Sequence, residues 1–354
     1  MNETLWHLKI LNSIYPPIFL LIGVSGNFLS MVIWIKRIRT SPGSTCLFLA
    51  LMCGTDTYVL VHGCMRHWLK SLMVGFDIRT ILDCKIPLMI FTLFSDLSVW
   101  LIVLLCIERS VCVFVPVDAK RICRLRNGTL AFMFTVCCLI AINFHFILTV
   151  KVSATRDYCV ATSAVAAKFH RAWPYIDFGL YSLVPLLFIF ILNSLILIKL
   201  HRAHSRLSRS RQSSIGRIFW TVLLMAIAHF LFTMPIGIYF LIPDEHCADA
   251  EVACEIISNM FTMLQQTNHL MHFFLYSITS TLFISDLKRM FPWLIKLKFF
   301  RQRVDTSRSR SKAVMDEFEC RTKADNQVEK SELITMSHYP IASSVEINMQ
   351  LTSL

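Results

Sequence analysis

A few ionisable residues interrupt long apolar stretches of this 354-residue sequence, and their chemistry needs an explanation. They are Asp56, Asp96 and the adjacent pair Glu108 and Arg109. Ionisable side chains in an apolar environment are costly and usually functional. An arginine there stays charged and offers a planar fork of hydrogen-bond donors. We find no nucleotide-binding loop, metal-ligand spacing or catalytic triad, so we expect binding and switching and not an enzyme.

The elements that must position these residues are helices that cross a membrane. Hydrophobic residues make up 55% of the sequence and charged residues 16%, and the mean hydropathy is +0.58. A bilayer core needs about 20 mostly apolar residues per helix, whereas barrel strands are about 10 residues long and alternate. We therefore predict an all-α membrane protein, a seven-transmembrane helix bundle. The spans lie near residues 14–35, 46–64, 86–107, 129–150, 174–198, 218–242 and 256–278.

The positions of lysine and arginine predict the orientation of the spans. The connectors after the first, third and fifth spans hold 3, 5 and 6 of them, against 1, 4, 4 and 0 in the segments of the other side. A further basic cluster follows the seventh span, so the positive-inside rule places the tail in the cytoplasm and the N-terminus outside. We expect a multi-pass plasma-membrane protein, whose net charge of +12 reflects orientation and not nucleic-acid binding.

The composition divides the chain into four parts. Asn2 in the first part is a glycosylation acceptor. The third part contains a short amphipathic eighth helix on the membrane, with Phe283, Leu287 and Phe291 on one side. The fourth part is polar, so we expect disorder there. The parts are an extracellular N-terminus (1–13), the bundle (14–279), the eighth helix with its membrane-proximal segment (280–300) and a cytoplasmic tail (301–354).

Most of the 13 cysteines lie within spans, where a thiol is a small apolar side chain. Cys84 precedes the third span and Cys159 lies in the loop after the fourth, both on the oxidising side. A disulfide between them would pin that loop across the bundle. Cys247 and Cys254 in the last outer loop form a second disulfide or remain two free thiols. That loop is acidic, either because it is solvated or because it steers a cationic ligand.

A set of single residues and short motifs stands at particular positions within and beside the spans. It comprises Gly26-Asn27, Asp56, Cys84, Glu108-Arg109-Ser110 with Arg109 25 residues after Cys84, Pro185, Pro235, Tyr276 and Phe283. This combination resembles the rhodopsin-like (class A) G-protein-coupled receptors over about residues 14–300. The resemblance implies a receptor without a cofactor that activates a heterotrimeric G protein.

The resemblance also implies roles for individual residues. Asp56 would hold an allosteric sodium ion among neutral oxygen donors, or hydrogen bonds between helices alone would satisfy it. Arg109 would pair with Glu108 at rest and contact the G protein when active. Asp96 matches no site of the family and faces either the bundle or the fourth span. The implied sodium pocket is Asn27, Asp56, Ser98, Asn268 and His272, and the implied coupling residues are Glu108, Arg109, Asn193 and Tyr276.

The sequence departs from the family pattern at several switch positions. Thr233 replaces the usual Trp of the sixth span, Asn193 the usual Tyr of the fifth, and His272 the usual Asn of the seventh. This variant pattern is similar to that of invertebrate neuropeptide receptors of the FMRFamide and thyrotropin-releasing-hormone receptor group. His272 is either a neutral buried histidine or carries a proton in place of sodium.

The residues at the outer half of the bundle narrow the range of possible ligand classes. Phe91 stands where amine receptors carry Asp, and Gln266 stands where opsins carry their retinal-linking Lys. We expect a cationic amidated neuropeptide. A chemosensory or lipid ligand is the alternative, and a seven-span transporter is a distant one. The expected cavity residues are Phe91, Trp100, Tyr175, Tyr181, Tyr239, Gln265 and Gln266.

The cytoplasmic side offers places for partners. The basic connector 199–217 suits a docked G protein. Phosphorylation of Ser331, Thr335 and Ser337 by a receptor kinase would add charge for arrestin. The C-terminal residue Leu354 suits a PDZ-domain protein, which binds a carboxylate and an apolar side chain by strand addition.

Overall fold

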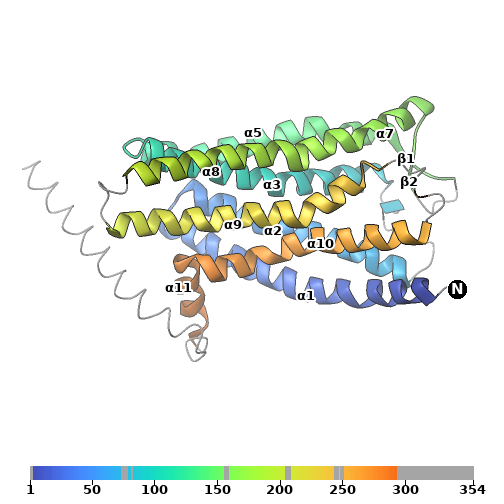
Figure 1. Cartoon of the computed structure of the whole chain (residues 1–354), viewed down its shortest axis with the longest axis horizontal. Helices are drawn as coiled ribbons and strands as arrows, with labels where there is room; N and C mark the ends of the chain where they lie inside the picture. Colours follow the sequence, from blue (N-terminus) through green and yellow to red (C-terminus); the bar gives the residue numbers. More distant parts are fainter. Residues whose placement is uncertain are drawn as a thin grey trace, which may run out of the picture. The chain divides into compact units, whose positions relative to one another are not determined.

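Within the described residues, seven long helical rods lie side by side in the computed structural model of the chain (Figure 1). The structure describes residues 3–72, 79–80, 83–154, 159–203, 209–242, 247 and 251–292. Met1–Phe291 forms one compact unit and contains every element below. The predicted all-α seven-helix bundle is confirmed. Predictions for Asn2, the loop acids Asp244, Glu245 and Asp249, and the tail residues Ser331, Thr335, Ser337 and Leu354 lie outside the described residues.

The long helices cross the bundle in turn, and shorter elements connect them. The long ones are α1 (Glu3–Thr40), α2 (Ser44–Leu72), α3 (Lys85–Phe114), α5 (Leu125–Asn143), α8 (Val184–Ala203), α9 (Arg209–Tyr239) and α10 (Glu251–Thr279). The shorter ones are α4 (Ala119–Ile122), α6 (His145–Thr149), β1 (Val150–Val152), β2 (Cys159–Ala161), α7 (Ala164–Phe178), the π-helical η2 (Gly179–Leu183) and α11 (Thr281–Met290).

Two of the seven rods are composite. The fourth span joins α5 and α6 as Leu125–Thr149. The fifth joins α7, η2 and α8 as Ala164–Lys199. A π-helical turn inside an α-helix widens the ladder of backbone hydrogen bonds and often occurs at functional sites. The five residues of η2 therefore rotate the side-chain directions of α8 about the helix axis relative to those of α7.

Six rods in the described part are long and apolar enough to span a bilayer by themselves. The seventh, α10, reaches that standard only together with α11, which follows after a bend of 96°. The reason is that α10 carries many polar side chains. The helix satisfies its own backbone groups, but these side chains need partners inside the bundle. Its buried polar residues are Asn259, Gln266, Asn268, His269 and His272.

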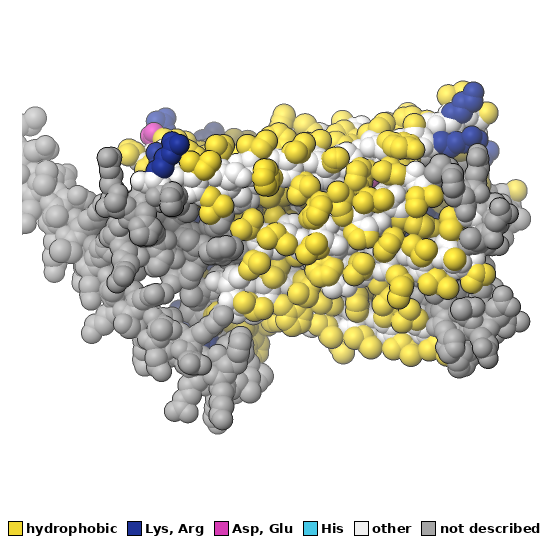
Figure 2. Space-filling view, viewed as in Figure 1, with side chains coloured by type: hydrophobic (Ala, Val, Ile, Leu, Met, Phe, Trp, Pro, Cys, Tyr) yellow, Lys and Arg dark blue, Asp and Glu magenta, His cyan; other side chains and the backbone are white. Residues whose placement is uncertain are grey.

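The surface of the bundle matches a lipid environment. Figure 2 shows hydrophobic side chains over the long sides of the molecule, with Lys and Arg near its two ends. Leu21 of α1 is 75% exposed and Phe190 of α8 is 68% exposed, and both lie well inside their spans. A soluble protein rarely exposes so continuous an apolar surface. The chain is a multi-pass membrane protein.

Disulfides tie loops to one end of the bundle. Cys84 at the start of α3 bonds Cys159 of β2, and β2 pairs antiparallel with β1. Cys247 bonds Cys254 near the start of α10, so of the two alternatives for these cysteines the disulfide is confirmed. We call this end, which carries Cys84 and Cys159, the disulfide end, and the opposite end the α11 end.

The short helix α11 is present at the predicted place, and its apolar side packs against the bundle. It begins at Ser280, whose hydroxyl accepts a hydrogen bond from the backbone N–H of Phe283 at 3.2 Å. The ring of Phe283 is fully buried, with ring centres 5.6 Å from those of Trp34 and Tyr276. Asp286 on the next turn pairs with Arg37 of α1. The helix therefore binds α1 and α10 together.

Replacing Phe283 with Ala should lower the melting temperature of the detergent-solubilised receptor. Removing a fully buried aromatic side chain costs roughly 3–5 kcal/mol in protein cores. The matched control is Leu282→Ala, because the neighbouring Leu282 is 46% exposed and loses little packing. Equal melting temperatures for the two variants would contradict this account of α11.

Candidate functional site

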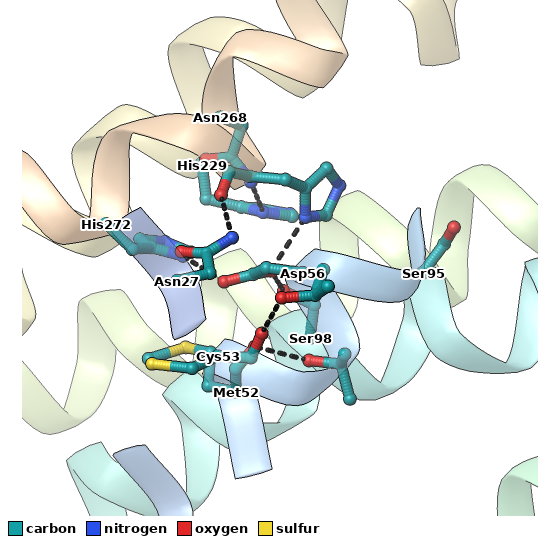
Figure 3. Close-up of polar contacts among 12 residues, drawn as sticks. Asn27, Met52, Cys53, Asp56, Ser95, Ser98, His229, Asn268 and His272 are labelled. Atoms are coloured by element: carbon teal, nitrogen blue, oxygen red, sulfur yellow. Dashed lines mark hydrogen bonds and ion pairs between the residues drawn. The ribbon is translucent and has the colours of Figure 1, made fainter. Parts of the chain in front are cut away.

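A buried polar centre surrounds Asp56 of α2 (Figure 3). Its Oδ1 accepts a hydrogen bond from Oγ of Ser98 in α3 at 2.8 Å and lies 2.8 Å from Nδ1 of His269 in α10. Its Oδ2 lies 2.6 Å from Nδ1 of His272, one turn further along α10. All four side chains are fully buried. Three helices therefore meet at one carboxylate.

The acceptor-only nature of an ionised carboxylate places the protons in this centre. His269 and His272 both present Nδ1 to Asp56, so each ring carries a proton on Nδ1 and donates it. Hydrogen bonds to an ionised acceptor are roughly twice as strong as neutral ones. Nε2 of each ring is buried and has no hydrogen-bond partner among the described residues. Among the described residues, Asp56 is therefore the one hydrogen-bond partner of both rings.

Two members of the predicted pocket do not reach the carboxylate. Nδ2 of Asn27 donates to the backbone carbonyl of His269 at 3.0 Å. Nδ2 of Asn268 lies 3.4 Å from Nδ1 of His229 in α9. The first amide holds α1 on α10, and the second holds α10 on α9. The three predicted members that do meet are Asp56, Ser98 and His272.

His269 is the member of this centre that the sequence reasoning missed. It stands three residues before His272 on the same helix. Residues three apart on a helix share a face, so two histidines at this spacing point toward one partner. The spacing was a usable signal once α10 was assigned as a helix.

The residues around Asp56 do not fit the sodium ion that the family resemblance implies. A hard cation takes oxygen ligands, whereas imidazole nitrogens suit softer metals. Here two ring N–H groups point at the carboxylate in place of neutral oxygens. In the described part of the chain, no group of three His, Cys, Asp or Glu side chains is arranged to hold a metal ion.

A second polar cluster lies at the α11 end, around Glu108 and Arg109. Oε1 of Glu108 accepts hydrogen bonds from Oγ of Ser44 at 2.6 Å and from Oγ1 of Thr45 at 2.7 Å. Nη2 of Arg109 donates to the same Thr45 hydroxyl at 2.5 Å. The expected direct pair is corrected here, because no ion pair joins Glu108 and Arg109 among the described residues. The Thr45 hydroxyl mediates between them.

The two other predicted coupling residues contact neighbouring helices. Tyr276 is fully buried, with its ring edge-on to Trp34 at 5.6 Å and stacked on His272 at 6.4 Å. Nδ2 of Asn193 donates to the carbonyl of Ile189 at 2.8 Å and lies 3.7 Å from Sγ of Cys106 in α3. These contacts place Tyr276 between α1 and α10, and Asn193 between α8 and α3.

Two residues predicted to line the ligand cavity contact neighbouring elements. Trp100 is half-buried, with its indole Nε1 buried and its ring packed on Phe188 of α8 at 6.3 Å between ring centres. Tyr175 is 59% exposed, and its hydroxyl lies 3.5 Å from the carbonyl of Leu241. Their place in a ligand cavity stays a prediction.

The other predicted cavity residues lie inside the bundle or at its disulfide end. The hydroxyl of Tyr181 accepts a hydrogen bond from Nε2 of Gln265 at 3.4 Å. The ring of Phe91 lies 4.7 Å from that of His62. The thiol of Cys64 donates to Oε1 of Gln266 at 3.0 Å, and the hydroxyl of Tyr239 donates to the carbonyl of Cys254 at 3.1 Å.

A line of polar contacts runs from this region toward Asp56. Nε2 of His229 lies 3.3 Å from the carbonyl of Tyr181, and Nδ1 of the same ring faces Asn268. Thr233, at the position of the usual Trp, donates to the carbonyl of His229 at 2.6 Å. Asn268 adjoins His269 in the sequence. Hydrogen bonds therefore connect Tyr181 with Asn268, and the next residue of the chain, His269, contacts Asp56.

The placement of Asp96 is now defined. Its Oδ2 accepts a hydrogen bond from Nδ2 of Asn143 in α5 at 2.9 Å. Of the two alternatives, the fourth span is therefore its neighbour. The carboxylate is 1% exposed, and its Oδ1 has no hydrogen-bond partner in the described ranges.

Comparison with known proteins agrees with this geometry. Residues 26–281, well over half of the chain, match the family model described as 7 transmembrane receptor (rhodopsin family). A search of the curated proteins gave no match. Members of the matched family are receptors that signal to heterotrimeric G proteins and are not enzymes. The chain belongs to the rhodopsin family of seven-transmembrane receptors.

Proposed function

We propose that this receptor lies in the plasma membrane with its N-terminus outside and responds to a cationic amidated peptide. The disulfide end then faces the extracellular fluid, where disulfides persist, and the α11 end faces the cytoplasm. The variant residues Asn193, Thr233 and His272 support a place near the invertebrate neuropeptide receptors of the FMRFamide and thyrotropin-releasing-hormone receptor group.

Two carboxylates that lack a basic partner support a positive charge on the ligand. Asp96 of α3 is buried, and Asp177 of α7 in the fifth span is partly buried. Neither forms an ion pair with a basic side chain within the described ranges. Like charges in a low-dielectric interior repel strongly unless a cation or a proton lies between them. A guanidinium or ammonium group of a ligand supplies that charge.

The surroundings of this pair suit the rest of a peptide. Asp177 precedes Tyr181 by four residues, so the two lie near one face of the fifth span. Tyr181 is buried, and its hydroxyl accepts a hydrogen bond from Nε2 of Gln265 in α10 at 3.4 Å. Aromatic faces attract cations, and amide side chains pair with a peptide backbone. The region between α3, α7 and α10 thus combines charge, aromatic surface and hydrogen bonding.

We also propose partners for the parts of the chain outside the described residues. Ser331, Thr335 and Ser337 would be receptor-kinase sites that recruit arrestin, Leu354 would bind a PDZ domain, and Asn2 would carry a glycan. Their support is the sequence alone. The G protein itself would dock at the α11 end, beside Arg109 and the basic connector 199–217.

A panel of amidated, arginine-containing peptides applied to cells that display the full chain should produce a calcium or cyclic AMP response. Lipids and small odorants in the same panel represent the rival ligand classes. A response to a lipid alone, or silence to every peptide with surface expression confirmed, would contradict the peptide proposal.

Replacing Asp177 with Asn should reduce the potency of an activating cationic peptide about tenfold or more, since losing about 1.4 kcal/mol of binding free energy is a factor of ten. A peptide in which the basic residue is replaced by a neutral isostere should lose no further potency on this variant. The matched control is Asp118→Asn, because Asp118 is exposed before α4. Equal potency losses in both variants would count against the cationic subsite.

Replacing Thr45 with Val should raise ligand-independent G-protein activation several-fold, measured as nucleotide exchange per surface receptor. The hydroxyl holds Arg109 beside Glu108. Its removal destabilises this conformation relative to the active one, so the active conformation becomes more populated. Thr57→Val is the control, because the Thr57 hydroxyl bonds only the carbonyl of Cys53 in its own helix, at 2.7 Å. Unchanged basal exchange in Thr45→Val would refute this role of the hydroxyl.

A further inference from the structure

The Asp56 centre is the position at which the family resemblance implies a sodium ion. We infer that in this receptor the histidine pair of α10, His269 and His272, takes the place of the cation, so that the centre binds no sodium. The inference rests on the contacts of Asp56 and on the family, and it is independent of the ligand of the receptor.

Protein donors already occupy three of the roughly four lone-pair sites of the carboxylate. Its Oδ1 receives the hydroxyl of Ser98 and the ring N–H of His269, and its Oδ2 receives the ring N–H of His272. Three hydrogens, each the positive end of a dipole, thus face the two oxygens. A cation at the same oxygens would meet this positive charge and would lose the attraction that makes a carboxylate a ligand.

The two rings are also held in place by packing. His269 and His272 are both fully buried, and His272 stacks on Tyr276 at 6.4 Å between ring centres. The backbone carbonyl of His269 accepts the amide of Asn27 and so fixes that turn of α10 against α1. Protein interiors are close-packed, so a ring cannot turn away without moving its neighbours. Admission of an ion would require both rings to move.

The consequence is a junction that is built from side chains alone. An ion would join α2, α3 and α10 through oxygen ligands and would come and go with its concentration. Here the same three helices are joined by side chains, which are present in every molecule whatever the ion concentration. The stability of the resting bundle therefore does not depend on external sodium.

The test is the melting temperature of the full-length receptor in detergent as sodium chloride replaces choline chloride at constant ionic strength. The wild type should show no sodium-specific change. The double variant His269→Asn with His272→Asn replaces two ring N–H donors with amide groups that offer oxygens. Its melting temperature should rise by a few °C with sodium, because an ion that binds only the folded state stabilises it.

Two further variants make the outcome decisive. The control His145→Asn with His170→Asn makes the same chemical change at another histidine pair, with ring centres 6.0 Å apart, and should stay indifferent to sodium. A sodium-specific rise in the wild type that Asp56→Asn abolishes would overturn the inference. A folded His269, His272 double variant that stays indifferent would overturn it too. If that variant does not fold, the titrations of wild type and Asp56→Asn still decide.

Discussion

A carboxylate buried in a membrane protein has to be solvated by the protein, because hydrocarbon supplies no donors. Asp56 meets this requirement with three donors from two other helices. The direction of α10, its rotation about its own axis and its distance from α2 all follow from bringing two histidines to one carboxylate. Asn27 and Asn268 then extend the same polar seam to α1 and α9.

The resulting bundle has two kinds of contact. Around most of its circumference, apolar side chains face lipid and carry no specificity. Inside, hydrogen bonds between distant residues fix which helix faces which, as Asn143 does for Asp96 and Thr45 for Glu108. Such bonds between membrane helices are worth roughly 1 kcal/mol each, so their number and placement set the packing more than any single one.

The sequence predicts the features that depend on length, spacing or compartment. Seven spans follow from bilayer thickness, the disulfide between Cys84 and Cys159 from the side on which both lie, and α11 from its apolar period. The sequence leaves the second pair open, and the structure joins it. The rotation of each helix does not follow, because apolar residues cover both lipid and interior faces. The hydrogen bond between Thr45 and Glu108 joins residues 63 apart, and their spacing in the sequence does not indicate it. His269 was readable from its spacing to His272.

The polarity of α10 also bears on how the chain enters the membrane. A segment that does not qualify as a span by itself partitions poorly from the protein-conducting channel into lipid. It becomes acceptable to the bilayer only when its amides and imidazoles are already matched by earlier helices. The carboxylate of Asp56 in α2 is the partner of both imidazoles, so the bilayer accommodates the last span as part of the bundle and not as an isolated helix.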